Sequence, residues 1–238
     1  MDKAKFIFFD CMETLIDLTE LPSASDYALW GFKGSGIENC WQDFHHFYMD
    51  YKLAKNILAS NAPAHREFEM FEVFQQTVAN RYPTYNLQDI NEMAEKLYTN
   101  YWKTYSSKCY AKDDVKTVVP QLAFLMPLGV VSNFMVTNGI EELLQSAGLL
   151  THFKFVVTSI SERWRKPSAA IFNTAIKKAG VNPSEIIFVG DDYTNDFLGA
   201  KDMGMNPILL DRYNRHTEVS PRITSFLELP ELILKQYC

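Results

Sequence analysis

The sequence lacks the features that mark several common classes of protein. Only four of its 238 residues are cysteine, and no CxxC pair or zinc-finger spacing occurs. No apolar run reaches the roughly 18 residues of a membrane-spanning helix, and the beginning of the chain shows no signal-peptide pattern. Basic residues are not in excess, since 23 Lys and Arg stand against 29 Asp and Glu, a net charge of −6. We therefore expect a cytoplasmic protein that has neither nucleic acid nor a membrane as partner.

The cysteines support the same prediction of a reducing compartment. They are scattered along the chain, at Cys11, Cys40, Cys109 and Cys238. Hydrophobic residues make up 47% and charged residues 22% of the chain, which is ordinary for a soluble globular protein. The length suits one large domain, or one domain with a substantial insertion.

The hydrophobic pattern changes twice along the chain. Residues 3–9 are an apolar run typical of a buried strand, whereas residues 22–105 are rich in aromatic residues at helical spacing and show no strand-like alternation. From about residue 113, short apolar strands alternate with helices. This organisation predicts one domain made of residues 1–18 and 108–238, with a helical domain of residues 19–107 inserted into it.

The second half of the chain predicts an α/β fold. Apolar strands are expected at residues 128–134, 153–159, 184–192 and 206–210, and helices at 113–126, 138–148, 167–180 and 194–204. Gly148 and Gly180 are typical signals for the end of a helix. Alternating strands and helices imply a parallel sheet with helices on both faces.

Chemically active residues follow the predicted strands. Ligands of such sheets bind beyond the carboxyl ends of the strands. The residues expected there are Asp10, Ser132, Asn133, Asp191 and Asp192, with Lys166 in the loop before a helix. Two acidic strand ends, a Ser-Asn strand end and a loop lysine together favour an active site over simple turns.

These residue types suit the transfer of a phosphoryl group. Asp10 can act as a carboxylate nucleophile that forms an aspartyl-phosphate. Asp191 and a neighbouring acid can hold Mg²⁺, which prefers oxygen ligands. Ser132 and backbone N–H groups can bind phosphate oxygens, and Lys166 can stabilise developing negative charge. We therefore expect a small phosphorylated substrate, bound in part by Ser132, Asn133 and Lys166.

Four segments resemble motifs of one family. They read, in chain order, FFDCMETLI, VVSNF, RKPSAAIF and IIFVGDDYTNDFLGA. Together they are similar to the four motifs of haloacid dehalogenase (HAD) superfamily hydrolases, in the family order. The resemblance implies a Rossmann-like parallel sheet, with a helical cap domain inserted between the first and second motifs.

The resemblance also implies roles for single residues. Asp10 matches the nucleophile, Ser132 the phosphate-binding hydroxyl and Lys166 the stabilising lysine. Asp191 matches a ligand of Mg²⁺ and Asp196 the second acid that supports the metal, a task that Asp192 is placed to share. The family metal also takes a backbone carbonyl two residues after the nucleophile, which Met12 can supply.

The side chain of Met12 departs from the phosphatase pattern. Phosphatases of this family have an aspartate there, which protonates the leaving alcohol and then activates water. Methionine cannot do either, and loss of such a group costs about 10²- to 10⁴-fold in rate. Glu13 is not an obvious replacement, because its side chain should point elsewhere.

Other chemistries stay open at this stage. A 2-haloacid dehalogenase needs no metal, but its fourth motif lacks the metal-type acids found here. A phosphonate-cleaving enzyme uses a cap lysine as a Schiff base, for which Lys33 is a candidate. A non-catalytic phosphate-binding protein would explain Met12, but not the retained Asp10, Lys166 and Asp191. The oligomeric state and the physiological substrate do not follow from the sequence.

Overall fold

The computed structural model describes residues 3–237, and its contacts divide the chain into two compact units. One unit consists of the described parts of Met1–Asp17 and Tyr110–Cys238, and the other of Leu18–Cys109. The changes of pattern along the sequence, after residue 18 and before residue 108, lie within two residues of these limits. Below, the first is called the α/β unit and the second the helical unit.

The α/β unit is built on a six-stranded parallel sheet, which confirms the predicted fold class. The strands lie in the order β5-β4-β1-β6-β7-β8. Their bounds are β1 Phe6–Phe9, β4 Leu128–Ser132, β5 Phe153–Thr158, β6 Ile186–Gly190, β7 Asn206–Leu210 and β8 Arg222–Ile223. Strands β1, β4 and β6 are adjacent, so the three predicted acidic and Ser-Asn strand ends meet at one edge of the sheet.

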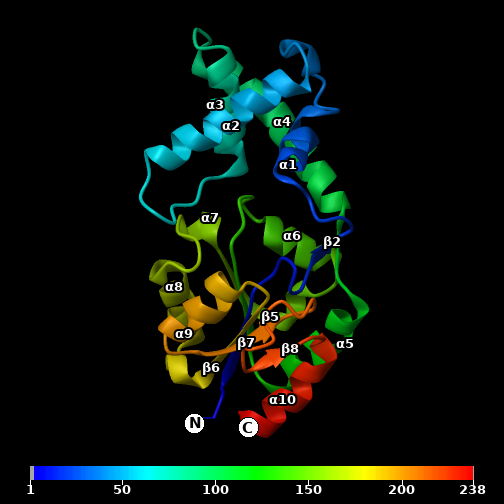
Figure 1. Ribbon diagram of the computed structural model, residues 1–238, viewed down its shortest axis with the longest axis vertical. Coiled ribbons are helices and arrows are strands. Elements are labelled where there is room, and N and C mark those ends of the chain that lie inside the picture. Colours follow the sequence, from blue (N-terminus) through cyan, green and yellow to red (C-terminus); the bar gives the residue numbers. More distant parts are fainter. Residues whose placement is uncertain (1–2, 238) are drawn as a thin grey trace. The chain divides into compact units, whose positions relative to one another are not determined.

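Strand β1 is apolar at every position because both faces of the sheet are covered. Phe6 and Phe8 belong to a core cluster that includes Phe172 of helix α8. On the opposite face, the ring of Phe9 stacks on Phe226 with 5.8 Å between centroids. Figure 1 shows α8 and α9 on one side of the sheet and α5 and α10 on the other.

The helices of the α/β unit follow the strands as the alternating pattern predicts. Their bounds are α5 Asp113–Leu125, α6 Gly139–Ser146, α7 Ser159–Glu162, α8 Ala169–Ala179, α9 Gly199–Asp202 and α10 Leu229–Gln236. Gly148 and Gly180, which follow α6 and α8, have positive φ angles of 73° and 67°, as residues that end a helix commonly do. Pro120 is accommodated inside α5.

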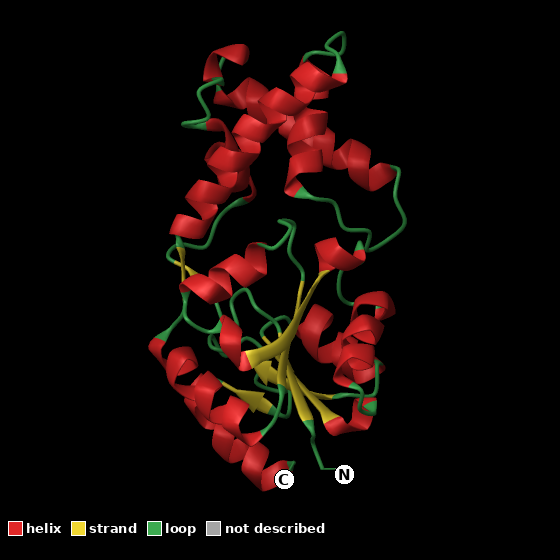
Figure 2. Cartoon of the chain, turned by 180° about the vertical axis from the view of Figure 1, so that it is seen from behind, coloured by secondary structure: helices red, strands yellow, loops and turns green. Residues whose placement is uncertain are grey.

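The helical unit contains the long helices that the aromatic spacing predicts. Its helices are α1 Ala24–Phe32, α2 Phe44–Ser60, α3 Met70–Arg81 and α4 Leu87–Ser107. The side chains of Asp43 and Asn86 accept hydrogen bonds from backbone N–H groups at the beginnings of α2 and α4. The core contains Phe47, whose ring lies 4.8 Å from Phe32 and 5.0 Å from Trp41. Figure 2 shows the sheet gathered in the other unit.

Several elements differ from the sequence prediction. The predicted helix at 194–204 is a π-helical segment, Tyr193–Leu198, followed by α9. Strand β8 and helix α10 were not predicted, and β2 Asp17–Leu18 and β3 Cys109–Tyr110 form a separate two-stranded sheet. These short elements are set by tertiary pairing, which a local hydrophobic pattern does not report.

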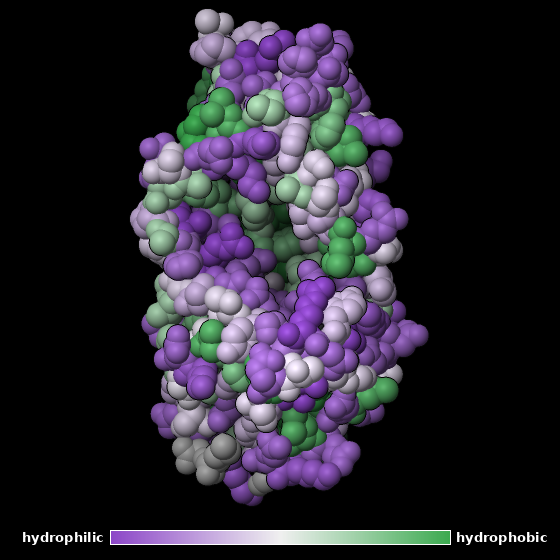
Figure 3. All heavy atoms as spheres, in the orientation of Figure 1, coloured by the Kyte–Doolittle hydropathy of each residue, from purple (hydrophilic) through white to green (hydrophobic). Residues whose placement is uncertain are grey.

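The surface and the cysteines agree with the composition. The face seen in Figure 3 is largely hydrophilic, with apolar residues in separate small groups. Within residues 3–237, no helix is both long and apolar enough to cross a membrane. Cys11, Cys40 and Cys109 form no disulfide bond within residues 3–237, and Cys238 lies outside the described residues.

Candidate active site

Asp10 lies directly after β1, at the edge where the strand ends meet, and is 7% exposed. Its backbone N–H donates to the carbonyl of Val189 in the neighbouring strand β6, at 2.9 Å. Its Oδ1 accepts a hydrogen bond from Ser132 Oγ at 3.2 Å and an ion-paired one from Lys166 Nζ at 2.6 Å. The central strand therefore delivers a carboxylate that two other segments hold in place.

Lys166 joins two of the predicted acids. It lies in the loop between α7 and α8, and its side chain is 2% exposed. Its Nζ lies 2.6 Å from Asp10 Oδ1 and 2.6 Å from Asp196 Oδ1. A buried ammonium group needs such partners, because an unpaired buried charge is strongly unfavourable.

Asn133 holds the backbone of Lys166 from both sides. Its Oδ1 accepts from the Lys166 N–H at 2.7 Å, and its Nδ2 donates to the Lys166 carbonyl at 3.1 Å. The sequence predicted Asn133 as a substrate-binding residue, whereas in this structure its amide is committed to positioning Lys166. The pairing spans 33 residues of chain and has no local sequence signal.

The fourth motif brings two further carboxylates to the same edge. Asp191 follows β6, and Asp196 lies within the π-helical segment with 1% exposure. Oxygen atoms of Asp10, Asp191 and Asp196 all lie within 4.8 Å of one another. Thr14 Oγ1 donates to Asp191 Oδ1 at 3.2 Å, which orients that carboxylate. This cluster of three acids, called the acidic triad below, is an oxygen-rich donor set of the kind that Mg²⁺ prefers.

Burial and the nearness of like charges shift the pKa values of two acids of the acidic triad. Burial, together with the neighbouring charges of Asp10 and Asp196, raises the pKa of Asp191 to about 8. Burial also raises the pKa of Asp196 to about 7, even though the Lys166 ammonium opposes the shift. Burial lowers the pKa of Lys166, but Asp10 and Asp196 outweigh it and raise this pKa above its ordinary value. In the absence of a divalent cation, bound protons therefore neutralise part of the negative charge of these carboxylates.

Asp192 has a different role from its neighbours. Its Oδ1 accepts from the N–H groups of Thr194 and Asn195, each at 2.8 Å, and its Oδ2 accepts from Asn195 Nδ2 at 2.7 Å. Asp192 therefore caps the π-helical segment and is not a member of the acidic triad. The fourth motif uses one acid to shape the backbone that carries the others.

Met12 and Glu13 lie in the tight turn after Asp10. Met12 forms an isolated bridge with Ile16, and the Glu13 N–H donates to the Ile16 carbonyl at 2.8 Å. Glu13 is exposed and has a φ of 61°. Desolvation, followed by the charges of Asp17 and Asp10, raises the pKa of Glu13. Met12 itself has no titratable group, and Glu13 lies in the turn and is not a member of the acidic triad.

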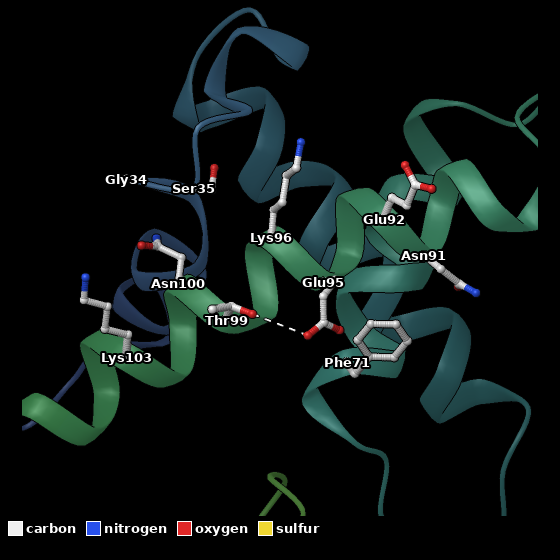
Figure 4. Close-up of a pocket in the computed structure, with 10 residues that line it drawn as sticks. All are labelled: Gly34, Ser35, Phe71, Asn91, Glu92, Glu95, Lys96, Thr99, Asn100 and Lys103. Carbon is white, nitrogen blue, oxygen red and sulfur yellow. Dashed lines mark hydrogen bonds between the residues drawn. The ribbon is translucent and has the colours of Figure 1, made fainter.

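The helical unit carries a separate open pocket of about 750 Å³ along α4. Figure 4 shows that acidic and basic side chains of α4 both border it, including Glu92 and Lys96. The amide of Asn100 is committed to the carbonyls that end α1, among them that of Lys33. Lys33 itself, the candidate Schiff-base lysine, is exposed. Exposed charges of both signs favour no class of ligand, so the acidic triad is the better candidate site.

Gly190 is required for the close approach of Asp196. A Cβ atom at residue 190 would lie 2.3 Å from Asp196 Oδ2. Gly190→Ala is therefore expected to destabilise the protein by about 1–3 kcal/mol, the usual cost of overpacking, as measured by urea unfolding. The double variant Gly190→Ala/Asp196→Gly should lose less than the sum of the single losses, because it removes the Asp196 oxygen, Cγ and Cβ atoms that the new Cβ would meet at 2.3, 2.5 and 2.6 Å. Additive losses would contradict this interpretation.

The comparisons with known proteins agree with this geometry. A family model described as haloacid dehalogenase-like hydrolase matches residues 31–210. The chain therefore belongs to the haloacid dehalogenase-like hydrolases, which confirms the resemblance of its motifs. The matched range includes Ser132, Lys166 and Asp191 but begins after Asp10.

Individual relatives differ in how much of their length this chain matches. Haloacid dehalogenase-like hydrolase domain-containing protein 3 of Danio rerio is 35% identical over 151 residues, which are 59% of this chain and 59% of that protein. The matches to its namesakes in Bos taurus, Xenopus laevis, Mus musculus and Homo sapiens cover only 32–36% of those relatives. Glyceraldehyde 3-phosphate phosphatase of Pyrococcus furiosus is 25% identical, over 98% of this chain and 93% of that protein.

Solved structures share the fold along almost the whole chain. A 2-haloacid dehalogenase from Pseudomonas syringae pv. Tomato DC3000 superposes with a TM-score of 0.77 at 20% identity, covering 99% of this chain and 100% of that one. A predicted phosphoglycolate phosphatase from Haemophilus somnus superposes with a TM-score of 0.63, also at 20% identity, covering 98% and 99% of the two chains. At this identity the likeness concerns the fold and not the reaction.

Proposed function

We propose that this protein is a Mg²⁺-dependent phosphatase that hydrolyses small phosphate monoesters through an aspartyl-phosphate on Asp10. The observation that carries the proposal is the position of Asp10, a buried carboxylate held by Lys166 and Ser132 beside two further acids. The full-length similarity to a protein named glyceraldehyde 3-phosphate phosphatase supports a phosphate ester as substrate. The predicted cytoplasmic location stays a prediction.

In this proposal each held side chain has a separate task. Asp10 attacks phosphorus, and the P–O bond to the leaving alcohol breaks as the new P–O bond to Asp10 forms. The Ser132 hydroxyl and the Lys166 ammonium bind the phosphoryl oxygens, on which negative charge is concentrated. Asn133 fixes the backbone of Lys166, so that its ammonium is already in position before the substrate arrives. Water then cleaves the aspartyl-phosphate and releases inorganic phosphate.

The residues present fit a magnesium ion. Asp10 and Asp191, supported by Asp196 and by the backbone carbonyl of Met12, would hold it. Burial, and after it the neighbouring negative charges, raise the pKa values of Asp191 and Asp196, and a bound divalent cation would favour the charged forms of both carboxylates. When bound, the ion would offset the repulsion between a phosphate dianion and the attacking carboxylate.

The helical unit, Leu18–Cys109, is proposed as the cap of this enzyme. Its helices pack around an aromatic core of their own. A cap that moves as one body needs such a core. A cap of this kind excludes water and selects the substrate. A small molecule is thus the expected partner.

The retained acids favour this function over its alternatives. A metal-free dehalogenase has no need for a cluster of three carboxylates in which Asp191 and Asp196 have raised pKa values. A phosphonate-cleaving enzyme needs a lysine that loses its proton in a sheltered position, whereas Lys33 is exposed. A non-catalytic phosphate-binding protein has no need for a carboxylate nucleophile that is ion-paired with a buried lysine. Hydrolysis of an aryl phosphate in the presence of Mg²⁺ tests the proposal, and a protein that cleaves no phosphate monoester would refute it.

The pH dependence of stability gives an independent test of the metal. In the metal-free protein, the pKa values of Asp191 and Asp196 lie above their ordinary value of 3.8, at about 8 and about 7. The folded state therefore binds more protons than the unfolded state between about pH 4 and pH 8, so these two groups lower stability as the pH rises through that range. Mg²⁺ replaces the protons, and the increase in melting temperature caused by millimolar Mg²⁺ should be larger at pH 8 than at pH 6.

Thermal melts with MgCl₂ or with EDTA at both pH values measure this difference. Asp191→Asn is the matched control, because it keeps the shape of the side chain and removes a ligand, and its melting temperature should not respond to Mg²⁺. Calorimetric titration should likewise show Mg²⁺ binding by the unmodified protein and none by Asp191→Asn. An unmodified protein that does not bind Mg²⁺ at millimolar concentration at pH 8 would count against the phosphatase.

A further inference from the structure

The loop that follows β7 is built as a rigid support at the same edge of the sheet. Asp211, which is 6% exposed, accepts the backbone N–H groups of Arg215 at 2.8 Å and His216 at 2.9 Å. Arg222 donates to Asp211 Oδ2 at 3.2 Å and to Asn214 Oδ1 at 2.8 Å. These bonds fix the course of the backbone up to His216, so the side chains of this segment, residues 211–216, are presented from a fixed frame.

Contacts tie this segment to the candidate active site. The ring of His216 stacks on Tyr193, with 4.9 Å between centroids and 19° between planes. Tyr193 is two residues beyond Asp191, so the stack anchors the segment to the fourth motif. On the other side, Arg215 is near enough to Glu13, three residues beyond Asp10, to oppose the rise in the pKa of Glu13.

Arg215 is an exposed cation of this region that forms no ion pair among residues 3–237. Its guanidinium is exposed and lies 4.9 Å from the ring centroid of Tyr213, with no ion pair within the described chain. Two nearby lysines are already paired: Lys112 lies 2.5 Å from Asp17, and Lys166 is held by Asp10 and Asp196. A guanidinium on a fixed backbone is well suited to bind a planar or tetrahedral anion with two hydrogen bonds.

We propose that Arg215 binds a second anionic group of the substrate, a carboxylate or a further phosphate, while the reacting phosphate lies at Asp10. The preferred substrate is then a small phosphate monoester that carries another negative charge. This inference rests on the proposed function for the position of the reacting phosphate. It adds a specificity determinant from the α/β unit itself, independent of the helical unit.

Binding of non-hydrolysable phosphonates tests the inference without requiring turnover. The probes are phosphonoacetate and its longer homologues, phosphonates with a second phosphate at the far end, and uncharged alkylphosphonates of the same lengths, titrated calorimetrically in MgCl₂. The unmodified protein should bind the best doubly anionic probe at least about tenfold more tightly than its uncharged counterpart. Arg215→Ala should abolish this preference and leave the affinity for alkylphosphonates within about twofold. Lys178→Ala, which removes an exposed charge near the end of α8, should retain the preference.

Each outcome decides the inference. A preference that survives in Arg215→Ala overturns it, and so does an unmodified protein that binds no doubly anionic probe better than the uncharged ones. The probe series separates the two anions, since a carboxylate site favours one set and a phosphate site the other. Failure of the proposed function is distinguishable, because it appears as the absence of aryl phosphate hydrolysis in the same preparation.

Discussion

Asp10→Asn is expected to lower phosphatase activity by at least about 10³-fold, because it removes the negative charge that attacks phosphorus. The variant keeps the size of the side chain, and its amide oxygen still accepts a hydrogen bond from Ser132. Lys166 keeps Asp196 as a partner at 2.6 Å, so the fold should be retained. The measurement is kcat/KM for an aryl phosphate in MgCl₂, accompanied by a thermal melt.

Asp192→Asn is the matched control for this result. It makes the same chemical change at an acid that caps the π-helical segment and lies outside the acidic triad. Asparagine is also a good capping residue, so activity should change by less than about tenfold. Activity that is unaltered in Asp10→Asn would have to come from a contaminant or from another site.

Met12→Asp is expected to increase the hydrolysis of alkyl phosphates by up to about 10²-fold, if the new carboxylate reaches the leaving oxygen. The unmodified protein, which has no acid at this position, should cleave aryl and acyl phosphates far faster than alkyl phosphates, since good leaving groups need little protonation. The gain in Met12→Asp should therefore be small for aryl phosphates. The measurement is kcat/KM across a series of leaving-group pKa values for both proteins.

Met12→Asn serves as the control, because it has the shape of aspartate without a titratable group and should gain nothing. A flat dependence on leaving-group pKa in the unmodified protein would contradict the interpretation of Met12 as a missing acid. Glu13 would then be the first residue to test, because it is close enough to Asp10 for that charge to raise its pKa. Glu13→Gln would distinguish this case by a loss confined to alkyl phosphates.

Much of the candidate site was predictable because its residues stand at the ends of apolar strands. Asp10, Ser132 and Asp191 each follow or end a run of buried residues, and parallel strands bring such ends to one edge of a sheet. The resemblance of the motifs to those of the family placed Lys166 and Asp196 beside them. The inferences from the strand ends depend on the local hydrophobic pattern, which the sequence carries directly.

Other properties were decided only by tertiary structure. Lys166 meets Asp10 across 156 residues of chain, and the amide of Asn133 turns to the Lys166 backbone instead of the open site. Asp191 and Asp192 are adjacent and chemically identical, yet one joins the acidic triad and the other caps a helix. The difference arises from the π-helical backbone, which directs their carboxylates to different partners.

The segment after β7 shows most clearly the difference between what the sequence determined and what depends on the tertiary structure. By itself the sequence determined the class of fold, the order of the motifs and the acids at the strand ends, since each is encoded by residues close together in the chain. It did not predict β8, α10 or the position of Arg215. The position of Arg215 depends on a buried Asp211 that accepts hydrogen bonds from the N–H groups of its own loop and from the side chain of Arg222, and on a stack between His216 and Tyr193. Contacts of this kind form only when the folded chain brings together distant groups whose polar atoms must be satisfied away from water.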